Sequence, residues 1–171
     1  MFFFFFILIL FIMRTIIHDL DNNNLINIRN DDIILTASNS KNCIGCFKCW
    51  LKTPLSCIFD DSLCNNGNIL LNTDELIIIS KNVNGCYSSN VKKVLERSLS
   101  YVLPYFSIRN GEIHHKLRSD RRIKLIVYLY GDITENDKLV FNSLVLSNKK
   151  NFDYASVAIN YVEGNVRNKI I

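Results

Sequence analysis

Short apolar runs alternate along the chain with longer amphipathic segments, a pattern typical of parallel strands joined by helices. Five runs are predicted as strands: residues 15–19, 33–37, 75–80, 124–130 and 156–162. The third contains Leu76-Ile77-Ile78-Ile79 and does not alternate with polar residues, so we expect it to be covered on both faces. Residues 88–99 and 134–148 carry apolar side chains at helical spacing, which predicts two crossover helices.

Polar residues at the helix starts support this assignment. Ser88 or Ser89 can cap the first helix, and Thr134 followed by Asp137 approximates a capping box for the second. The asparagine-rich residues 20–32 leave room for about two helical turns, so the first crossover is predicted to be weak. Right-handed crossovers on a five-stranded parallel sheet predict an α/β, flavodoxin-like three-layer sandwich, with ligands at the carboxyl ends of the strands.

The 171 residues fit one domain, which we place at residues 13–171. The preceding residues 1–12, MFFFFFILILFI, are wholly apolar. As a helix they would span about 18 Å, less than the roughly 30 Å of a bilayer core, so no transmembrane span is predicted. They also lack the basic start and small-residue cleavage site of a secretory signal. This favours Met13 as the true start, over a membrane-surface tail or a degenerate signal, and a cytoplasmic location.

The net charge of +4 comes mostly from scattered basic residues. No recognition helix, zinc finger or aromatic-basic sheet motif accompanies them, so nucleic acid is not expected as a partner. A small anionic ligand is compatible with this charge.

Four of the six cysteines lie close together: Cys43, Cys46 and Cys49 are spaced by two residues, and Cys57 follows. Thiolates at this spacing suit a metal or an iron–sulfur cluster, and Gly45 gives the turn backbone freedom. Zinc is less favoured, because structural zinc sites usually take ligands from two separated knuckles. A thiol–disulfide switch and structural thiols are the alternatives.

The turn that carries Cys43, Cys46 and Cys49, called the cysteine turn below, follows the second predicted strand, and residues 81–88 follow the third. We therefore expect both to open on the same edge of the sheet, where ligands bind in such folds. His18 ends the first strand and is well placed for the same edge. Trp50 is expected to pack, and His114 and His115 to point to opposite sides of a strand.

Four segments carry a family resemblance. They are Cys43-Ile44-Gly45-Cys46-Phe47-Lys48-Cys49-Trp50 with Cys57 and Asp60-Asp61; Asn84-Gly85-Cys86-Tyr87-Ser88 with the helix that follows; Leu103-Pro104-Tyr105-Phe106; and Gly111-Glu112-Ile113-His114-His115-Lys116-Leu117-Arg118. Across residues 31–132 the chain resembles the flavodoxin-like NADPH-dependent FMN reductases and the iron–sulfur flavoproteins. For Asp60 and Asp61 we expect a structural role, as a salt link of the cysteine loop or a helix cap.

The resemblance implies an oxidoreductase that passes electrons between NAD(P)H, FMN and an acceptor, either a small redox substrate or an electron-transfer protein. It implies flavin contacts from Asn82, Asn84, Gly85, Tyr87 and Ser88, and a 4Fe-4S cluster held by Cys43, Cys46, Cys49 and Cys57. A homodimer is also implied, because relatives often pair to complete the flavin site.

One loop departs from the family pattern. Relatives place a Gly-Ser-Pro-Arg type loop after the first strand to hold the FMN phosphate, whereas this chain has His18-Asp19-Leu20-Asp21-Asn22-Asn23-Asn24. Two aspartates repel a phosphate. The alternative is therefore a non-enzymatic module that keeps the fold, binds a metal or a partner, and has lost FMN.

Overall fold

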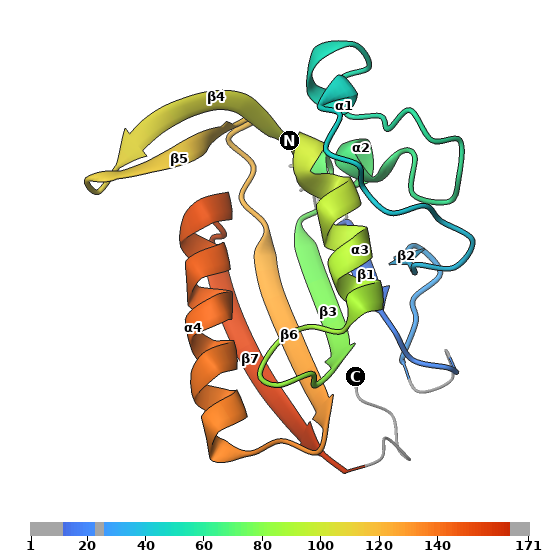
Figure 1. Cartoon of the computed structure of the whole chain (residues 1–171), viewed down its shortest axis with the longest axis vertical. Helices are drawn as coiled ribbons and strands as arrows, with labels where there is room; N and C mark the ends of the chain where they lie inside the picture. The colour runs from blue at the N-terminus through green and yellow to red at the C-terminus, as the bar shows by residue number, and fades with distance from the viewer. Residues whose placement is uncertain (1–11, 23–25, 165–171) are drawn as a thin grey trace, which may run out of the picture.

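The computed structural model describes residues 12–22 and 26–164 (Figure 1). The strands are β1 Arg14–His18, β2 Ile33–Leu35, β3 Glu75–Lys81, β4 Val102–Arg109, β5 Glu112–Leu117, β6 Lys124–Gly131 and β7 Ser156–Glu163. The helices are α1 Lys48–Leu51, α2 Asn66–Leu71, α3 Ser89–Ser98 and α4 Glu135–Phe152, and a 3-10 turn, Leu99–Tyr101, follows α3.

Five strands form one parallel sheet in the order β2-β1-β3-β6-β7. The chain goes from β1 outward to β2, then returns past β1 to β3, so the strand order reverses beside β1. This is the flavodoxin-like order, and it confirms the predicted fold class. The five predicted strands are all present, each within about two residues of its expected ends.

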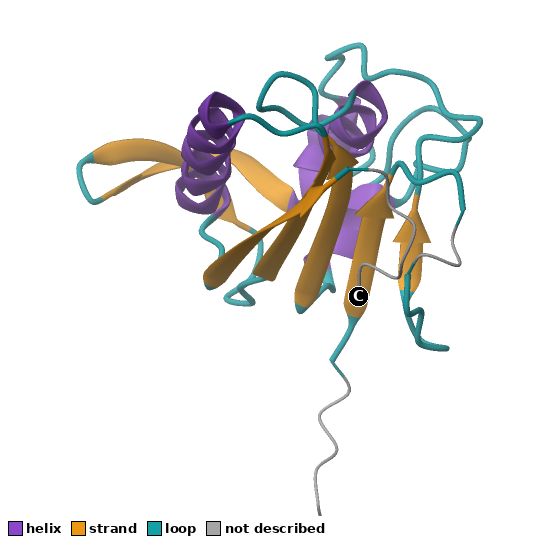
Figure 2. Ribbon diagram, turned by 90° about the horizontal axis from the view of Figure 1, so that it is seen from below, coloured by secondary structure: helices purple, strands orange, loops and turns teal. Residues whose placement is uncertain are grey.

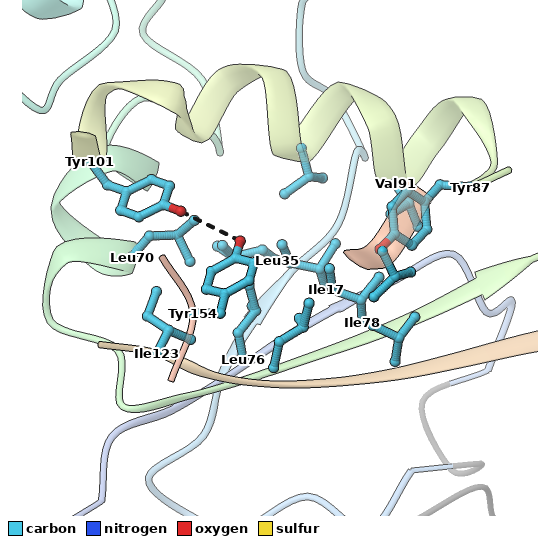
Figure 3. Close-up of a cluster of buried hydrophobic side chains, with 14 of the residues drawn as sticks. Ile17, Leu35, Leu70, Leu76, Ile78, Tyr87, Val91, Tyr101, Ile123 and Tyr154 are labelled. Carbon is cyan, nitrogen blue, oxygen red and sulfur yellow. Dashed lines mark hydrogen bonds between the residues drawn. The ribbon is translucent and has the colours of Figure 1, made fainter. Parts of the chain in front are cut away.

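The sheet buries both of its faces at the centre, as the unbroken apolar run of β3 predicts: Leu76, Ile77, Ile78 and Ile79 are 0–3% exposed. Leu76 and Ile78 belong to the larger core, which α3 enters with Val91 and Val94 and α4 with Phe141 and Val145. Figure 3 shows part of this core, where Tyr101 and Tyr154 share a buried hydroxyl–hydroxyl hydrogen bond of 3.4 Å.

The opposite face holds a smaller cluster of Ile16, Ile26, Ile77 and Ile79, and Leu20 packs against it. Ile26 and Leu20 come from the connection between β1 and β2. All four helices of the described chain contribute to the larger cluster instead, and Figure 1 shows α3 and α4 together over that face.

Both long helices begin where their caps predict. The Ser88 side chain accepts a hydrogen bond from the Val91 N–H, and Thr134 and Asp137 form a reciprocal capping box.

The connection from β1 to β2 contains no helix in its described residues, 19–22 and 26–32. Arg14 holds this connection instead: its guanidinium is paired with Asp32 and donates to the Asn27 carbonyl oxygen at 2.9 Å. In these described residues the parallel pair of β1 and β2 therefore forms without a helical crossover. The sequence left room for about two helical turns there, and none is present in the described residues.

A hairpin of β4 and β5 follows α3. A strand was predicted at His114 and His115, but its pairing with β4 was not. It projects beyond the end of α4 (Figures 1 and 2). Its inner side is tied to the C-terminal end of α4: Arg109 pairs with Asp153, directly after the helix, at 3.0 Å, and Glu112 pairs with Lys150 at 3.1 Å. Its outer side carries Phe106, Ile108 and Ile113, each more than 60% exposed.

None of the described helices has the length and apolar character that crossing a membrane requires. The predicted apolar extension, residues 1–12, lies outside the described chain apart from Ile12.

Candidate functional site at the carboxyl edge

A cleft of about 480 Å³ opens at the carboxyl edge, beside the point where the strand order reverses. Its polar lining comes from the end of β1, the residues after β2 and the first turn of α3: His18, Asp19, Asp21, Thr36, Ser38 and Asn90. These elements meet because parallel strands end at one edge of the sheet. The cleft lies where the strand order predicts a ligand.

Asp19 ties three strand ends together. Its carboxylate accepts from the Lys81 backbone N–H at 3.1 Å and from the Tyr130 hydroxyl at 3.0 Å. Burial and the neighbouring Asp19 raise the pKa of Tyr130, so this phenol stays protonated and keeps donating. From its sequence position, Asp19 is predicted only to repel a phosphate. Its partners come from β3 and β6, which no local pattern could reveal.

His18 is 2% exposed at the inner end of the cleft. Its Nδ1 accepts from the Leu20 N–H at 3.2 Å, which places the ring proton on Nε2. Nε2 is buried and has no hydrogen-bond partner in the described part of the chain. Burial lowers the pKa of His18 against the opposing effect of Asp19, so the imidazole is neutral near pH 7.

The cleft does not fit the phosphate of an FMN. Phosphate sites in such folds use backbone N–H groups at the N-terminus of the helix after the first strand, but no helix follows β1 in the described residues. The helix whose first turn lines this cleft, α3, follows β3 instead. Asp19 and Asp21 add negative charge, and the lining contains no lysine or arginine. The first strand thus lacks the phosphate-binding loop of the family in the structure as in the sequence, and the polar cleft there has no lysine or arginine in its lining.

The loop predicted to contact a flavin ring, residues 82–88, turns toward α4. Asn84 and Gly85 have φ values of 52° and 72°, and Val83 and Cys86 exchange two backbone hydrogen bonds of 3.1 Å. This is the geometry of a type I′ turn, for which Asn-Gly is the preferred pair. A Cβ on Gly85 would stand 2.7 Å from the Cβ of Val140, so the turn lies directly against α4.

Most of the predicted contact residues in this loop already have structural partners. The Asn82 amide donates to the Asp132 carbonyl oxygen at 2.7 Å and accepts from the Gly85 N–H at 2.9 Å. Tyr87 is buried with its ring edge-on to Phe141, and Ser88 caps α3. Asn84 is exposed. Of the five residues, Asn84 is therefore the most accessible for direct contact with a ligand.

The cysteine turn lies at the other end of α3 from this cleft. After Ser38 the chain runs back along α3, where Lys93 donates to the Ser40 carbonyl oxygen at 3.2 Å and Arg97 to the Lys41 carbonyl oxygen at 2.7 Å. Figure 1 shows α1 at the end of the molecule opposite the arrowhead of β3. The prediction that the cysteine turn and loop 82–88 open on one edge is wrong, because the segment after β2 does not stay at the carboxyl edge.

The four cysteines are neighbours but do not form a closed ligand set. Cys43 and Cys46 are exposed, whereas Cys49 and Cys57 are partly buried. Burial raises the pKa of Cys49, and Cys57, Cys43 and Cys46 add to this rise, so all four thiols lie in one neighbourhood. Within residues 12–22 and 26–164, no three His, Cys, Asp or Glu side chains are arranged to hold a metal ion. The predicted iron–sulfur cluster therefore has no support in this geometry.

An aromatic stack joins the cysteine turn to the hairpin. Ring centroids are 5.5 Å apart for Phe47 and Trp50, 5.1 Å for Trp50 and His115, and 4.6 Å for His115 and Phe106. Trp50 also packs against the main core, which confirms its predicted packing role. His114 lies on the opposite side of β5 and is buried, as the alternation of a strand predicts.

Arg97 and Asp61 anchor the cysteine loop. The two guanidinium nitrogens reach the two carboxylate oxygens at 3.0 and 2.8 Å, and both side chains are at most 9% exposed. Asp61 also accepts from the Lys41 and Leu63 N–H groups at 3.0 Å each. This confirms the predicted structural role of Asp61 as a salt link of this loop.

This anchor predicts a loss of stability in acid. The Arg97 guanidinium, with the two N–H donors, lowers the pKa of Asp61 from 3.8 to about 2. A carboxyl whose pKa is lower in the folded state stabilises the fold above its unfolded pKa, and this contribution disappears between about pH 4 and pH 2. We expect the stability advantage of the wild type over Asp61→Asn to shrink by about 2 kcal/mol across that range, measured by urea unfolding. An advantage that stays constant would contradict this assignment.

No protein-family model matches the sequence, and no curated protein matches it significantly. Among solved structures, the crystal structure of an FMN-dependent NADH-azoreductase from Bacillus anthracis str. Ames Ancestor, in complex with FMN, is similar to this chain. The match has a TM-score of 0.54 and 12% sequence identity, and it covers 90% of this chain and 88% of that chain. At this identity the likeness establishes the flavodoxin-like fold.

Proposed function

We propose that this chain is a flavodoxin-like oxidoreductase that binds a flavin at the carboxyl edge and passes electrons from NAD(P)H to a small-molecule acceptor or an electron-transfer protein. The cleft between His18 and Asn90 carries this proposal, because it lies at the switch point of the sheet, where such folds bind their ligands. A structural neighbour described as FMN-dependent and NADH-using supports the same chemistry.

The residues of this chain would hold the flavin from two sides. Thr36, Ser38 and Asn90 offer hydroxyl and amide groups in the cleft, and the loop of residues 82–88 would border the ring. In that loop we assign direct contact to Asn84, while Asn82, Gly85, Tyr87 and Ser88 fix its shape. A bound flavin would supply hydride acceptance and electron transfer.

Gly85 offers a sharp test of this loop. Gly85→Ala places a methyl group against Val140, so the turn must move, and we expect flavin affinity to fall by about tenfold or more. Gly111→Ala is a matched control, because it lies in a second Asn-Gly turn with the same sign of φ and has nothing within 4 Å of the added Cβ. Flavin fluorescence titration measures both variants.

A first measurement decides the proposal as a whole. The full chain, purified without oxygen, should show the visible absorption of an oxidised flavin or take up added flavin, and then oxidise NAD(P)H. A colourless protein that takes up neither riboflavin nor FMN would reject the oxidoreductase. The alternative, a binding module without a cofactor, would then be favoured, and the missing phosphate cradle is the observation that supports it.

The cysteine turn remains a candidate metal site. Thiolates have the right donor chemistry for an iron–sulfur cluster or zinc, and four are available at Cys43, Cys46, Cys49 and Cys57. In the described structure, however, no three of these side chains are arranged to hold a metal ion. We expect iron or zinc to co-purify with the chain and to be lost in Cys49→Ser but not in Cys86→Ser, whose thiol lies in the loop after β3. Metal-free protein would leave these residues as thiols.

A further inference from the structure

The carboxyl-edge cleft differs in charge from a phosphate site, and this difference has a consequence for the ligand. Resting on the proposed function, we infer that the cleft takes the uncharged polyhydroxyl chain of a flavin without its terminal phosphate. The protein would then select riboflavin over FMN. Three independent features of the cleft support this selection.

The first feature is electrostatic. Asp19 and Asp21 both line the cleft, no lysine or arginine does, and buried His18 is neutral. A phosphate monoester carries between one and two negative charges near pH 7. Bringing it beside the two carboxylates is unfavourable in the reduced dielectric of a cleft, whereas a chain of hydroxyl groups carries no such penalty.

The second feature is that two backbone donors at the strand ends are already in use. The Lys81 N–H donates to Asp19, and the Leu20 N–H donates to His18 Nδ1. Residues 18–38 contain no glycine, so the tight turn of a phosphate nest is hard to build there. These N–H groups are therefore satisfied within the protein and are not offered to an anion.

The third feature is the set of groups that remain. Thr36 and Ser38 place their hydroxyl oxygens 3.1 Å apart, and each can donate or accept. Asp21 is an exposed acceptor, and His18 Nε2 is a buried donor without a partner in the described residues. In dinucleotide-binding α/β folds an acidic side chain accepts a hydrogen bond from a ribose hydroxyl group. This set of donors and acceptors suits the adjacent hydroxyl groups of a flavin's polyhydroxyl chain.

The experiment is a fluorescence titration of the full chain with riboflavin and with FMN, at low and at high salt. We expect riboflavin to bind about tenfold more tightly than FMN at low salt, and this ratio to shrink as salt screens the carboxylates. Asp21→Asn should narrow the ratio severalfold by improving FMN binding. Asp31→Asn, which removes the same charge from the exposed connection before β2, should leave the ratio unchanged.

The outcomes separate the two proposals. Equal or tighter binding of FMN would overturn the selection for an uncharged chain and leave the oxidoreductase standing. A riboflavin preference that Asp21→Asn does not reduce would also overturn it, because the carboxylate would not be its source. If neither flavin binds to folded protein, the proposed function itself fails, and the inference fails with it.

Discussion

Replacing Arg97 with methionine is expected to lower the free energy of unfolding by about 3–5 kcal/mol. The Arg97 side chain is fully buried, and methionine fills similar space without the charge. The substitution leaves the Asp61 carboxylate, which is 9% exposed, without its cationic partner, and it removes the donor to the Lys41 carbonyl oxygen. An unpaired buried charge costs far more than the pair itself contributes.

Two comparisons make this expectation specific. Arg121→Met removes an exposed arginine paired with Asp74 at 3.0 Å and should cost at most about 1 kcal/mol. The double variant Arg97→Met/Asp61→Leu should recover part of the loss, because no charge is then left unpaired. Equal losses for Arg97→Met and Arg121→Met, measured by urea unfolding, would show that the buried pair does not anchor the cysteine loop.

The second large effect is expected for Phe141→Ala, with a loss of about 3–5 kcal/mol. Phe141 is 0% exposed on α4, and its ring lies 5.2 Å from that of Tyr87 and 6.3 Å from that of Tyr161. Removing the ring opens a cavity beneath Tyr87. We therefore expect the loop of residues 82–88 to become less ordered, and flavin affinity to fall together with stability.

Phe106→Ala is the control for this substitution. Phe106 is 61% exposed on the outer side of the hairpin, so its loss should change stability by about 0.5 kcal/mol or less. Thermal unfolding of the two variants side by side measures the difference. If Phe141→Ala were as mild as Phe106→Ala, the core between α4 and the sheet would be far more able to collapse than its packing indicates.

Local patterns were enough to determine the framework of this protein. The unbroken apolar run Leu76 to Ile79 predicts a central strand because only a strand covered on both faces buries every residue. Ser88 and Thr134 predict the starts of α3 and α4 because helix caps depend on groups three residues away. The order of strands and helices then leaves few topologies, and the flavodoxin-like one is correct.

Only the tertiary structure decided where the chemistry lies. The sequence places the cysteine turn after β2. Lys93 and Arg97, however, bind the backbone that leads to this turn, so that it runs along α3 and away from the carboxyl edge. Asp19 finds its partners at Lys81 and Tyr130, 62 and 111 residues further along the chain. Such contacts depend on how distant segments meet in space, and the local spacing of residues contains no record of them.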